Sequence, residues 1–432
     1  MSARPYSPTA DFAATADRAD ALGGLRDEFH LPADDDGEPQ IYFCGNSLGL
    51  QPKRAARLVQ EELEDWRRLA VRGHLHARRP WVPYHEQLAA HTAELIGAEP
   101  LEVVNMNSLT VNLHLMMVSF YRPTCERYRL LIERPAFPSD RYAAESQVRF
   151  HGLDPAEALI EIGPREGEQA IREDDLMERI DRDGPSIALV LLPGVQYYSG
   201  QVFDMAAIAR AARRHGCAVG FDLAHAIGNV SMQLHDWGAD FAVWCSYKYL
   251  NAGPGAVGGC FVHARHAESP TLERFAGWWG HDKQTRFRMG PEFSPIRGAE
   301  GWQLSNPPIL SLAPLIASLD LFHRAGIGDL RRKSVALTGY LEFLLRERCA
   351  EHVQILTPSA ERGCQLSLKI RGGAGRATFE RLESRGVVAD WRDPDVIRIA
   401  PVPSYNSFTE VYRFVDILEA LLPAPGGHGQ MQ

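Results

Sequence analysis

The chain has 432 residues, of which 45% are hydrophobic and 23% are charged, and its formal net charge is −9. This composition is typical of a globular protein with a substantial core, and the acidic excess disfavours nucleic-acid binding through phosphate contacts. No apolar run approaches the ~18 residues that span a bilayer, and the N-terminal residues lack the apolar segment of a secretory signal. Seven scattered cysteines without a C-x-x-C pair disfavour a disulfide framework. We therefore expect a cytoplasmic enzyme that binds neither nucleic acid nor membrane.

Short apolar runs alternate with helical patterns between residues 128 and 265. We expect a helix over Met205–His215 and strands at Tyr128–Glu133, Ala158–Ile162, Ile187–Leu192, Cys217–Phe221, Asp240–Cys245 and Gly259–His263. Continuous apolar strands interleaved with helices are typical of a mainly parallel sheet that helices cover on both faces.

The pattern changes from about Pro308 onwards. Ile309–Arg348 has helical periodicity, and we expect it to form more than one helix. Further expected elements are strands at Val353–Leu356, Gln365–Ile370 and Val396–Ala400, a helix near Thr378–Arg385, and a helix from Thr409 to about Leu422 with Ser407 as its N-cap.

These patterns predict an α/β protein with a large and a small domain. The large domain would span residues 46–310, and residues 311–422 would form the linking helices and the small C-terminal α/β domain. The N-terminal segment, residues 1–45, is assigned to neither domain, and its packing against the small one stays open. Residues 423–432 are expected to form a disordered tail.

Polar side chains follow three of the predicted strands. Asp222 and His225 follow Cys217–Phe221, Lys248 comes shortly after the next strand, and the earlier strand that ends at Glu133 runs into Phe137-Pro-Ser-Asp140. Ligands bind at the carboxyl ends of the strands in open parallel sheets. An aspartate and a lysine at this edge form either an ion pair or a site for pyridoxal phosphate. That cofactor needs a lysine amine for its aldehyde and a carboxylate for its ring nitrogen.

A third feature concerns phosphate binding. The sequence Asn107-Ser-Leu-Thr110 precedes an apolar helical run over Val111–Phe120. This order places hydroxyl groups and free backbone amides at a helix N-terminus, where anions bind. A hydroxyl residue alone is more often an ordinary N-cap, but the three features together favour the cofactor.

Five motifs occur in the order DLAHAIGN, SYKYLNAGPG, GWWGH, SNPPI and IRIAPVPSYNSF. Together they closely resemble the kynureninase family, and the resemblance runs from about Tyr42 to about Leu421. It implies pyridoxal 5'-phosphate as cofactor and the aspartate-aminotransferase-like fold, which is fold type I. It also implies a hydrolase that splits the Cβ–Cγ bond of L-kynurenine or 3-hydroxy-L-kynurenine, in tryptophan catabolism or NAD biosynthesis. The products would be L-alanine and anthranilate or 3-hydroxyanthranilate.

The resemblance also implies roles for individual residues. Lys248 would form the Schiff base, Asp222 would pair with the pyridinium nitrogen and Tyr247 would relay protons. The other cofactor-binding residues would be Leu109, Thr110, Phe137, Pro138, Ser139, Asp140 and His225, together with Trp278 and Asn306 from the neighbouring subunit of a homodimer. Arg398 would bind the substrate α-carboxylate, because a guanidinium group pairs with a carboxylate through two hydrogen bonds.

A polar pocket for the substrate ring is a further implication of the resemblance. His74, Ser305 and Asn306 would line it. Unpaired buried polar groups cost on the order of 1–3 kcal/mol, so this pocket favours the 3-hydroxy substrate. Pro193 stands where the family can have a hydroxyl residue, and its contact with the cofactor is left open.

Metal binding is not expected. His74 and His76 have the spacing of a metal pair but lack a suitably spaced carboxylate or cysteine. His263, His266 and Glu268 look like a metal cluster, but we interpret them as a solvated loop.

Two rival functions remain. The first is a cysteine desulfurase or a related aminotransferase of the same fold, with Cys364 as the sulfur acceptor. Such a cysteine is exposed and has a low pKa, whereas the apolar strand after Cys364 predicts a partly buried residue. The second rival is a non-catalytic dimer that binds pyridoxal phosphate. The presence of both Lys248 and Arg398 disfavours it.

Overall fold

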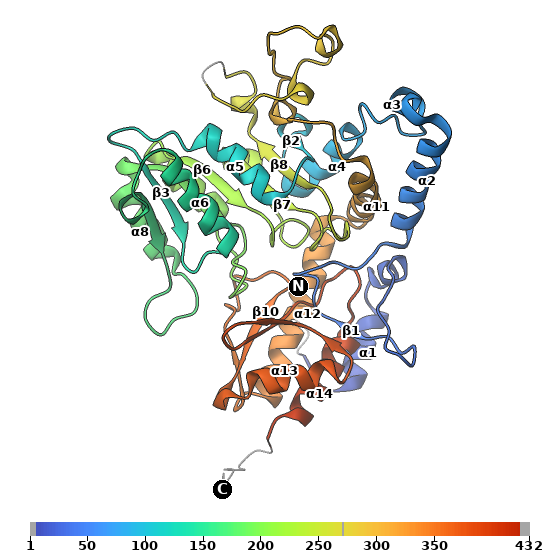
Figure 1. The fold of residues 1–432 in the computed structure, drawn as a ribbon. Coiled ribbons are helices and arrows are strands. Elements are labelled where there is room, and N and C mark those ends of the chain that lie inside the picture. Colours follow the sequence, from blue (N-terminus) through green and yellow to red (C-terminus); the bar gives the residue numbers. More distant parts are fainter. Residues whose placement is uncertain (1–5, 270–271, 424–432) are drawn as a thin grey trace.

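Two sheets, one above the other in Figure 1, organise the chain. The computed structural model describes residues 6–269 and 272–423, so residues 424–432 of the predicted tail lie outside the described residues. The upper sheet has seven strands and the lower sheet has four. In the described ranges, no helix has the length and apolar character needed to cross a membrane.

The seven-stranded sheet has the strand order β2-β8-β7-β6-β5-β3-β4. Its strands are β2 (Val103–Val104), β3 (Arg129–Glu133), β4 (Leu159–Ile162), β5 (Ile187–Pro193), β6 (Ala218–Asp222), β7 (Phe241–Cys245) and β8 (Gly258–Val262). The strands from β7 to β4 are parallel, whereas β8 runs antiparallel to both β7 and β2. The predicted, mainly parallel sheet is therefore confirmed, with strand ends that differ by one residue at most. Only β2 was not predicted.

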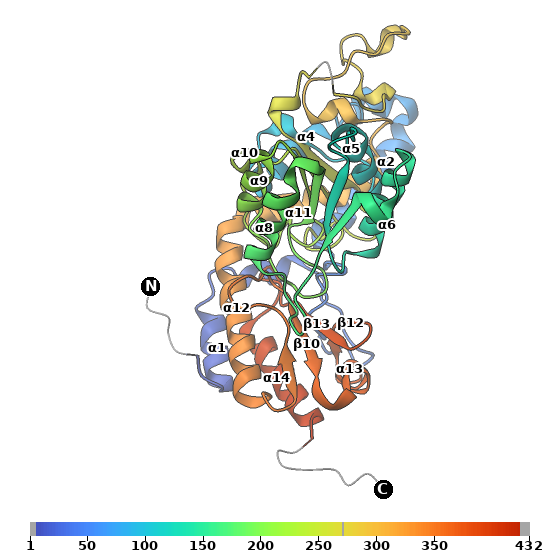
Figure 2. The same cartoon turned by 90° about the vertical axis from the view of Figure 1, so that its left-hand side faces the viewer.

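Helices cover both faces of this sheet because its central strands are apolar on both sides. Every residue of β7 is buried. One face packs against α4 (Glu86–Ile96), α8 (Glu173–Asp183), α9 (Met205–Arg214) and α11 (Ile309–Ala325), and the other against α5 (Leu109–Phe120) and α6 (Pro138–Phe150). Figure 2 shows α8 and α9 on one side of the strands and α6 on the other.

The predicted helix α9 is confirmed and illustrates the local signals. Asp204 caps it, because the Asp204 side chain accepts a hydrogen bond from the Ala207 N–H. Arg213 and Arg214 occupy the last turn, where positive charge is favourable. The predicted helical stretch after Pro308 forms two helices, α11 and α12 (Ile327–Arg348), because Gly326 adopts a positive φ of 73° between them.

The four-stranded sheet forms the core of the small C-terminal body. Its order is β12-β13-β10-β9 and all its pairs are antiparallel. The elements are β9 (Val353–Ile355), β10 (Leu366–Ile370), α13 (Gly375–Glu383), β12 (Asp390–Arg392), β13 (Val396–Ile399) and α14 (Phe408–Leu421). Ser407 caps α14 as predicted, and Glu410 completes a capping box. Strand β12 was not predicted, because its residues Asp390–Arg392 include two charged side chains and form no apolar run.

The N-terminal segment contacts the small body. Helix α1 (Ala10–Arg18) lies beside α12 and α14 (Figure 2). Asp17 accepts hydrogen bonds from the N–H groups of Phe408 and Thr409. Strand β1 (Ile41–Tyr42) pairs with β11 (Val387–Val388). The predicted domain boundaries stay predictions, since these contacts do not define where one domain ends.

Short elements complete the described chain. The remaining α-helices are α2 (Lys53–Leu69), α3 (Gly73–His76), α7 (Pro155–Ala158) and α10 (Leu234–Trp237). The 3-10 helices are η1 (Gly23–Glu28), η2 (Ala70–Arg72), η3 (Pro100–Glu102), η4 (Gly184–Ser186), η5 (Ala264–His266), η6 (Trp278–Gly280), η7 (Arg286–Arg288), η8 (Ala299–Trp302) and η9 (Arg371–Gly373).

Candidate active site

A cavity opens at the carboxyl ends of the parallel strands, as expected for an open α/β sheet. The residues that line it are Leu109, Thr110, Glu133, Phe137, Ser139, Asp140, Pro193, Val195, Tyr197, Asp222, Ala224, His225, Tyr247 and Lys248. All the cofactor-binding residues predicted within one chain are among them, except Pro138, which begins α6. Pro193 also lines the cavity, at the end of β5.

Lys248 points at a histidine. Its Nζ lies 3.0 Å from His225 Nε2. Burial, and next the positive charge of Lys248, lower the pKa of His225 well below its ordinary value. The His225 ring is therefore neutral, and its Nε2 can accept a hydrogen bond from the lysine. The ring centroids of Phe137 and Tyr247 each lie 5.9 Å from Nζ, so two aromatic rings lie close to the amine.

Three carboxyl groups approach the other side of the cavity. Burial, and next the negative charge of Asp222, raise the pKa of Asp140 well above its ordinary value. Burial also raises the pKa of Glu133 to about 8. Asp222 ends β6 and accepts a 2.6 Å hydrogen bond from the Ala224 N–H, while the buried Asp140 Oδ1 has no hydrogen-bond partner among the described residues. This corner of the cavity has an excess of acidic groups and suits a protonated ring nitrogen.

Two helix N-termini meet at a third part of the cavity. Helix α5 begins at Leu109, and its N-cap residue Ser108 makes no side-chain capping bond. Helix α6 begins at Pro138, and Ser139 Oγ lies 2.9 Å from Thr110 Oγ1, which joins the two first turns. Free amides, two hydroxyls and two helix dipoles suit a phosphate group. The Lys248 amine, the carboxylates and this anion site together fit pyridoxal phosphate.

Arg398 lies near the cavity without lining it. The side chain is buried, its Nε donates a 2.9 Å hydrogen bond to Asp390, and its Nη1 donates one of 2.7 Å to the carbonyl of Tyr197. Tyr197 itself lines the cavity. The positive charge of Arg398 also contributes to the low pKa of His225, although less than burial and Lys248 do. Arg398 thus stands behind the cavity wall on the side of the small body.

Four predicted site residues do not reach this cavity within one chain. Trp278, Ser305 and Asn306 are exposed, and the ring of His74 packs edge-on against Trp81 with 5.5 Å between ring centroids. Neither of the candidate metal-binding groups in the described ranges contains His74 or His76.

Glu133, Val195, Tyr197 and Ala224 line the cavity and were not predicted. A signal existed for Glu133, because it ends a predicted strand next to the strand-end residues that were recognised. No comparable signal existed for Tyr197, since the turn that brings it to the cavity depends on contacts with the small body: Gln365 Nε2 donates a hydrogen bond to its carbonyl.

The prediction for Cys364 is confirmed in its main point, since the side chain is buried and in fact fully so. Burial raises the pKa of the Cys364 thiol to about 11, so it lacks the exposure and acidity of a sulfur acceptor. The solvated-loop interpretation of His263 and His266 is wrong. The chain after β8 folds against neighbouring segments, so that His263 contacts Glu102 and His266 contacts Asp240.

Known proteins with similar sequences are kynureninases. A family model described as "Kynureninase C-terminal domain" matches residues 330–418. The kynureninase of Myxococcus xanthus (strain DK1622) is 60% identical over 96% of this chain and 97% of its own length. The kynureninase of Koribacter versatilis (strain Ellin345) is 55% identical over 96% and 98%, respectively. These relatives agree with the resemblance carried by the five motifs.

Solved structures with a similar fold use the same cofactor or come from related enzymes. The enzyme C-DES with glycine covalently linked to its pyridoxal-phosphate cofactor has a TM-score of 0.74, at 18% identity over 88% of this chain and 96% of its own. A cysteine desulfurase from Escherichia coli has a TM-score of 0.73, at 16% identity over 93% and 98%. At such identities the similarity shows the fold, and the predicted fold type I is confirmed.

We expect the substitution Glu133→Gln to change how stability depends on pH. The folded-state pKa of Glu133 is about 8 and the ordinary value is 4.5, so between these values only the folded state holds the proton. Stability therefore falls as the pH rises from about 4.5 to about 8, by up to a few kcal/mol. Melting temperatures of the cofactor-free protein between pH 5 and 8 should fall less steeply in the variant. Equal slopes in both proteins would contradict the buried, protonated carboxyl.

Proposed function

The chain belongs to the kynureninase family, and from this premise we propose how its cavity performs the reaction. It is a pyridoxal-phosphate-dependent hydrolase that cleaves the Cβ–Cγ bond of a kynurenine and releases L-alanine and an anthranilate. The residue assignments rest on one observation. Lys248, the two aspartates Asp140 and Asp222, and two helix N-termini surround the same cavity.

The cavity offers each part of the cofactor a partner. Lys248 would bind its aldehyde, Asp222 and Asp140 its ring nitrogen, and Phe137 the face of its ring. The first turns of α5 and α6 would hold the phosphate, through Leu109, Thr110 and Ser139. The cofactor, when bound, supplies an electron sink for the bonds around the substrate Cα.

Lys248 and Tyr247 would move the protons. Lys248 Nζ can take a proton at the substrate Cα, and the neutral His225 ring 3.0 Å away orients this amine through a hydrogen bond. Burial raises the pKa of Tyr247, so its phenol stays protonated and can donate a proton to the developing alanine. These two groups provide the base and the acid that hydration of the side-chain ketone and release of alanine require.

Arg398 would bind the substrate α-carboxylate. Its buried guanidinium is already oriented by Asp390 and by the Tyr197 carbonyl. Its Nη2 makes no hydrogen bond among the described residues, although it lies 2.7 Å from Asp390 Oδ1. A carboxylate that enters past Tyr197 would pair with this guanidinium in place of part of its contact with Asp390.

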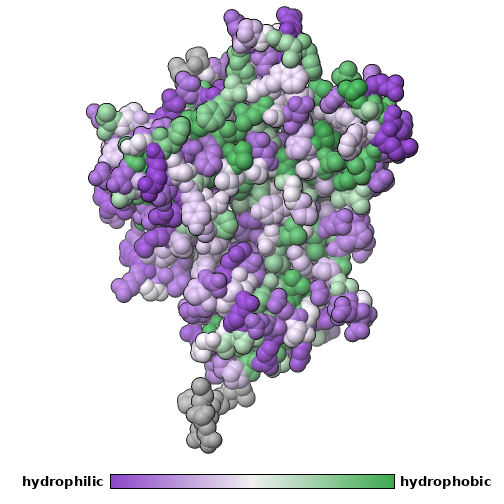
Figure 3. Space-filling model, viewed as in Figure 1, coloured by the Kyte–Doolittle hydropathy of each residue, from purple (hydrophilic) through white to green (hydrophobic). Residues whose placement is uncertain are grey.

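We propose that the enzyme is a cytoplasmic homodimer whose subunits share their active sites. Large apolar side chains are exposed along α2, η2 and α3 (Trp66, Val71 and Leu75) and around η6 and η7 (Trp278, Phe287 and Met289). Figure 3 shows the hydrophobic surface over α2 and α3. Exposed apolar patches of this kind mark protein interfaces. Across such an interface, residues of one subunit would reach the cavity of the other subunit. These residues would be Trp278, Asn306, His74 and Ser305, which do not reach the cavity of their own chain.

Purified protein with added pyridoxal phosphate should convert kynurenine to equal amounts of a fluorescent anthranilate and alanine. Lys248→Ala should lower kcat by about 10²–10⁴-fold or more, because the variant lacks the amine that moves the proton. Cys364→Ala should keep its turnover. If the protein instead released sulfur from cysteine, and Cys364→Ala abolished that release, the chain would be a desulfurase.

His74→Ala and Asn306→Thr should each lower kcat/KM for 3-hydroxykynurenine more than for kynurenine. Loss of one hydrogen bond to the ring hydroxyl is worth about 1 kcal/mol, which is roughly a fivefold change in the ratio of the two kcat/KM values. The ratio is measured with both substrates at one pH. An unchanged ratio in both variants would remove these residues from the substrate pocket.

Mixing two inactive variants tests the shared active site. Lys248→Ala and Trp278→Ala each impair both sites of their own homodimer, whereas a mixed dimer has one intact site. After subunit exchange, about a quarter of all sites should be native, and activity should rise accordingly. Exchange is verified by co-purification through a tag on one variant. Exchange without any gain in activity would contradict a site built from two subunits.

A further inference from the structure

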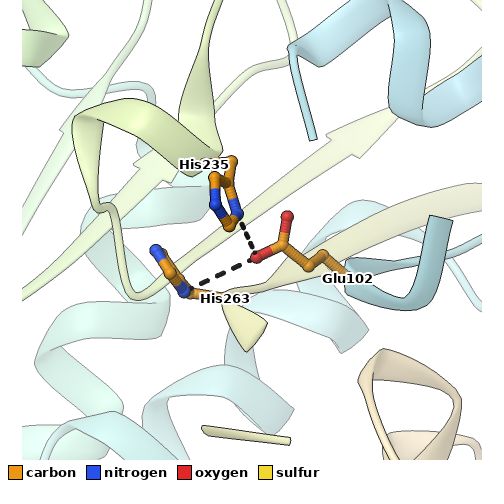
Figure 4. Close-up of side chains that lie close together, drawn as sticks. All are labelled: Glu102, His235 and His263. Carbon is orange, nitrogen blue, oxygen red and sulfur yellow. Dashed lines mark hydrogen bonds and ion pairs between the residues drawn. The ribbon is translucent and has the colours of Figure 1, made fainter. Parts of the chain in front are cut away.

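Glu102, His235 and His263 lie together outside the active site (Figure 4). Glu102 ends η3 directly before β2, His235 lies in α10, and His263 follows β8. Because β8 runs antiparallel to β7, Val262 at its end pairs with Phe241, the first residue of β7. Lys248 follows the other end of β7. The three side chains therefore occupy the edge of the sheet opposite to the catalytic cavity.

The distances between the three side chains are those of ligands around one metal ion. Glu102 Oε1 lies 2.9 Å from His235 Nδ1 and 3.5 Å from His263 Nδ1, and all three atoms lie within 4.8 Å of one another. With bonds of about 2.0–2.1 Å, these separations correspond to ligand–metal–ligand angles of roughly 90° and 115°. Two imidazole nitrogens and one carboxylate oxygen form a donor set that zinc uses, with further positions left for water.

Both imidazole rings are oriented toward the same carboxylate oxygen. The rings are stacked, with 4.9 Å between their centroids and 24° between their planes, so their Nδ1 atoms face Glu102 from one side (Figure 4). His263 Nδ1 accepts a hydrogen bond of 3.1 Å from the Arg265 N–H, so this nitrogen presents a lone pair while it faces the carboxylate. Two acceptor atoms that face each other are stabilised by a cation between them.

The carboxylate is held rigidly and lacks a cationic side chain other than histidine. The Glu102 side chain is fully buried, whereas His235 is 36% exposed and opens the cluster to solvent. Its Oε1 accepts a hydrogen bond from the Ala264 N–H and its Oε2 one from the Glu99 N–H. Within residues 6–269 and 272–423, no lysine or arginine forms an ion pair with Glu102. A buried carboxylate that backbone donors fix and that is open to solvent on one side is oriented to bind an ion.

A second group of similar composition shows the contrast. His85, Glu86 and Glu300 also lie within ligand distance of one another. There, however, Lys283 Nζ lies 3.0 Å from Glu86 and 2.7 Å from Glu300, so a cation of the chain already occupies the group. The group around Glu102 lacks such a lysine.

We propose that Glu102, His235 and His263 bind a divalent transition-metal ion of the zinc class. The ion replaces the hydrogen bond between His235 and Glu102 and the one between Arg265 and His263. It joins three segments that are far apart in the sequence, at the edge of the sheet where β2 and β8 pair. The ion stabilises the part of the chain built around the seven-stranded sheet, and it does not act on the catalytic cavity, which lies at the opposite edge of that sheet.

The experiment titrates Zn²⁺ into the metal-free holoenzyme in competition with a chromogenic chelator. We expect one tight equivalent per chain, and a loss of affinity of at least ~100-fold in His235→Ala and in His263→Asn, since each variant lacks a ligand. Asparagine at position 263 keeps an acceptor for the Arg265 N–H and so preserves the turn. Zinc should also raise the melting temperature of the wild type and leave that of both variants unchanged.

His215→Ala serves as the matched control. His215 pairs with one carboxylate, Asp181, at 2.9 Å, and the pair has no second imidazole. This variant should bind zinc as tightly as the wild type. Circular dichroism and cofactor absorbance establish that every variant is folded and loaded.

Two outcomes would overturn the proposal. If the wild type binds no tight equivalent of zinc, the three side chains form a hydrogen-bonded network only. If binding persists unchanged in both His235→Ala and His263→Asn, the metal is an adventitious ion held elsewhere on the chain.

Discussion

The pair of buried carboxyls at the bottom of the cavity is the constraint on which the site depends. Asp140 and Asp222 come from different elements, and burial, followed by the negative charge of Asp222, raises the pKa of Asp140 well above its ordinary value. Two such groups out of water require either a shared proton or a cationic partner. Lys248 is directed at His225, and its positive charge lowers the pKa of Asp140 less than burial and the neighbouring acids raise it. The cavity is therefore built around a positive charge that a ligand has to bring.

The parallel sheet makes this arrangement possible. Strands β3, β5, β6 and β7 end at the same edge, so the residues that follow them meet although they are separated by more than one hundred positions in the chain. The sheet interior is apolar on both faces and holds these ends in place. Helices α5 and α6 also start at this edge, which adds two positive helix ends to the cavity.

Polar contacts tie the small body to the wall of the cavity. Gln365 Nε2 and Arg398 Nη1 both donate hydrogen bonds to the Tyr197 carbonyl, and the N-terminal segment packs onto the same body through Asp17. These contacts thus fix Arg398 of the small body, which we propose binds the carboxylate, relative to the proposed catalytic groups of the large body. This coupling explains why Tyr197, in a loop after β5, belongs to the cavity wall.

Much of this protein follows from the sequence alone, because the informative signals are local. Apolar runs located six strands of the large sheet to within one residue at each end, and the hydroxyl of Ser407 predicted the N-cap of α14. Five motifs taken together, two of them around Asp222 and Lys248, indicated the family, since the residues of each motif are adjacent in the chain. Only the tertiary structure decided which residues from distant parts of the sequence come into contact. It placed Glu133 among the acids, buried Cys364, and brought His263 to Glu102 through the antiparallel course of β8. These contacts depend on strand order and direction, which no local pattern of residues encodes.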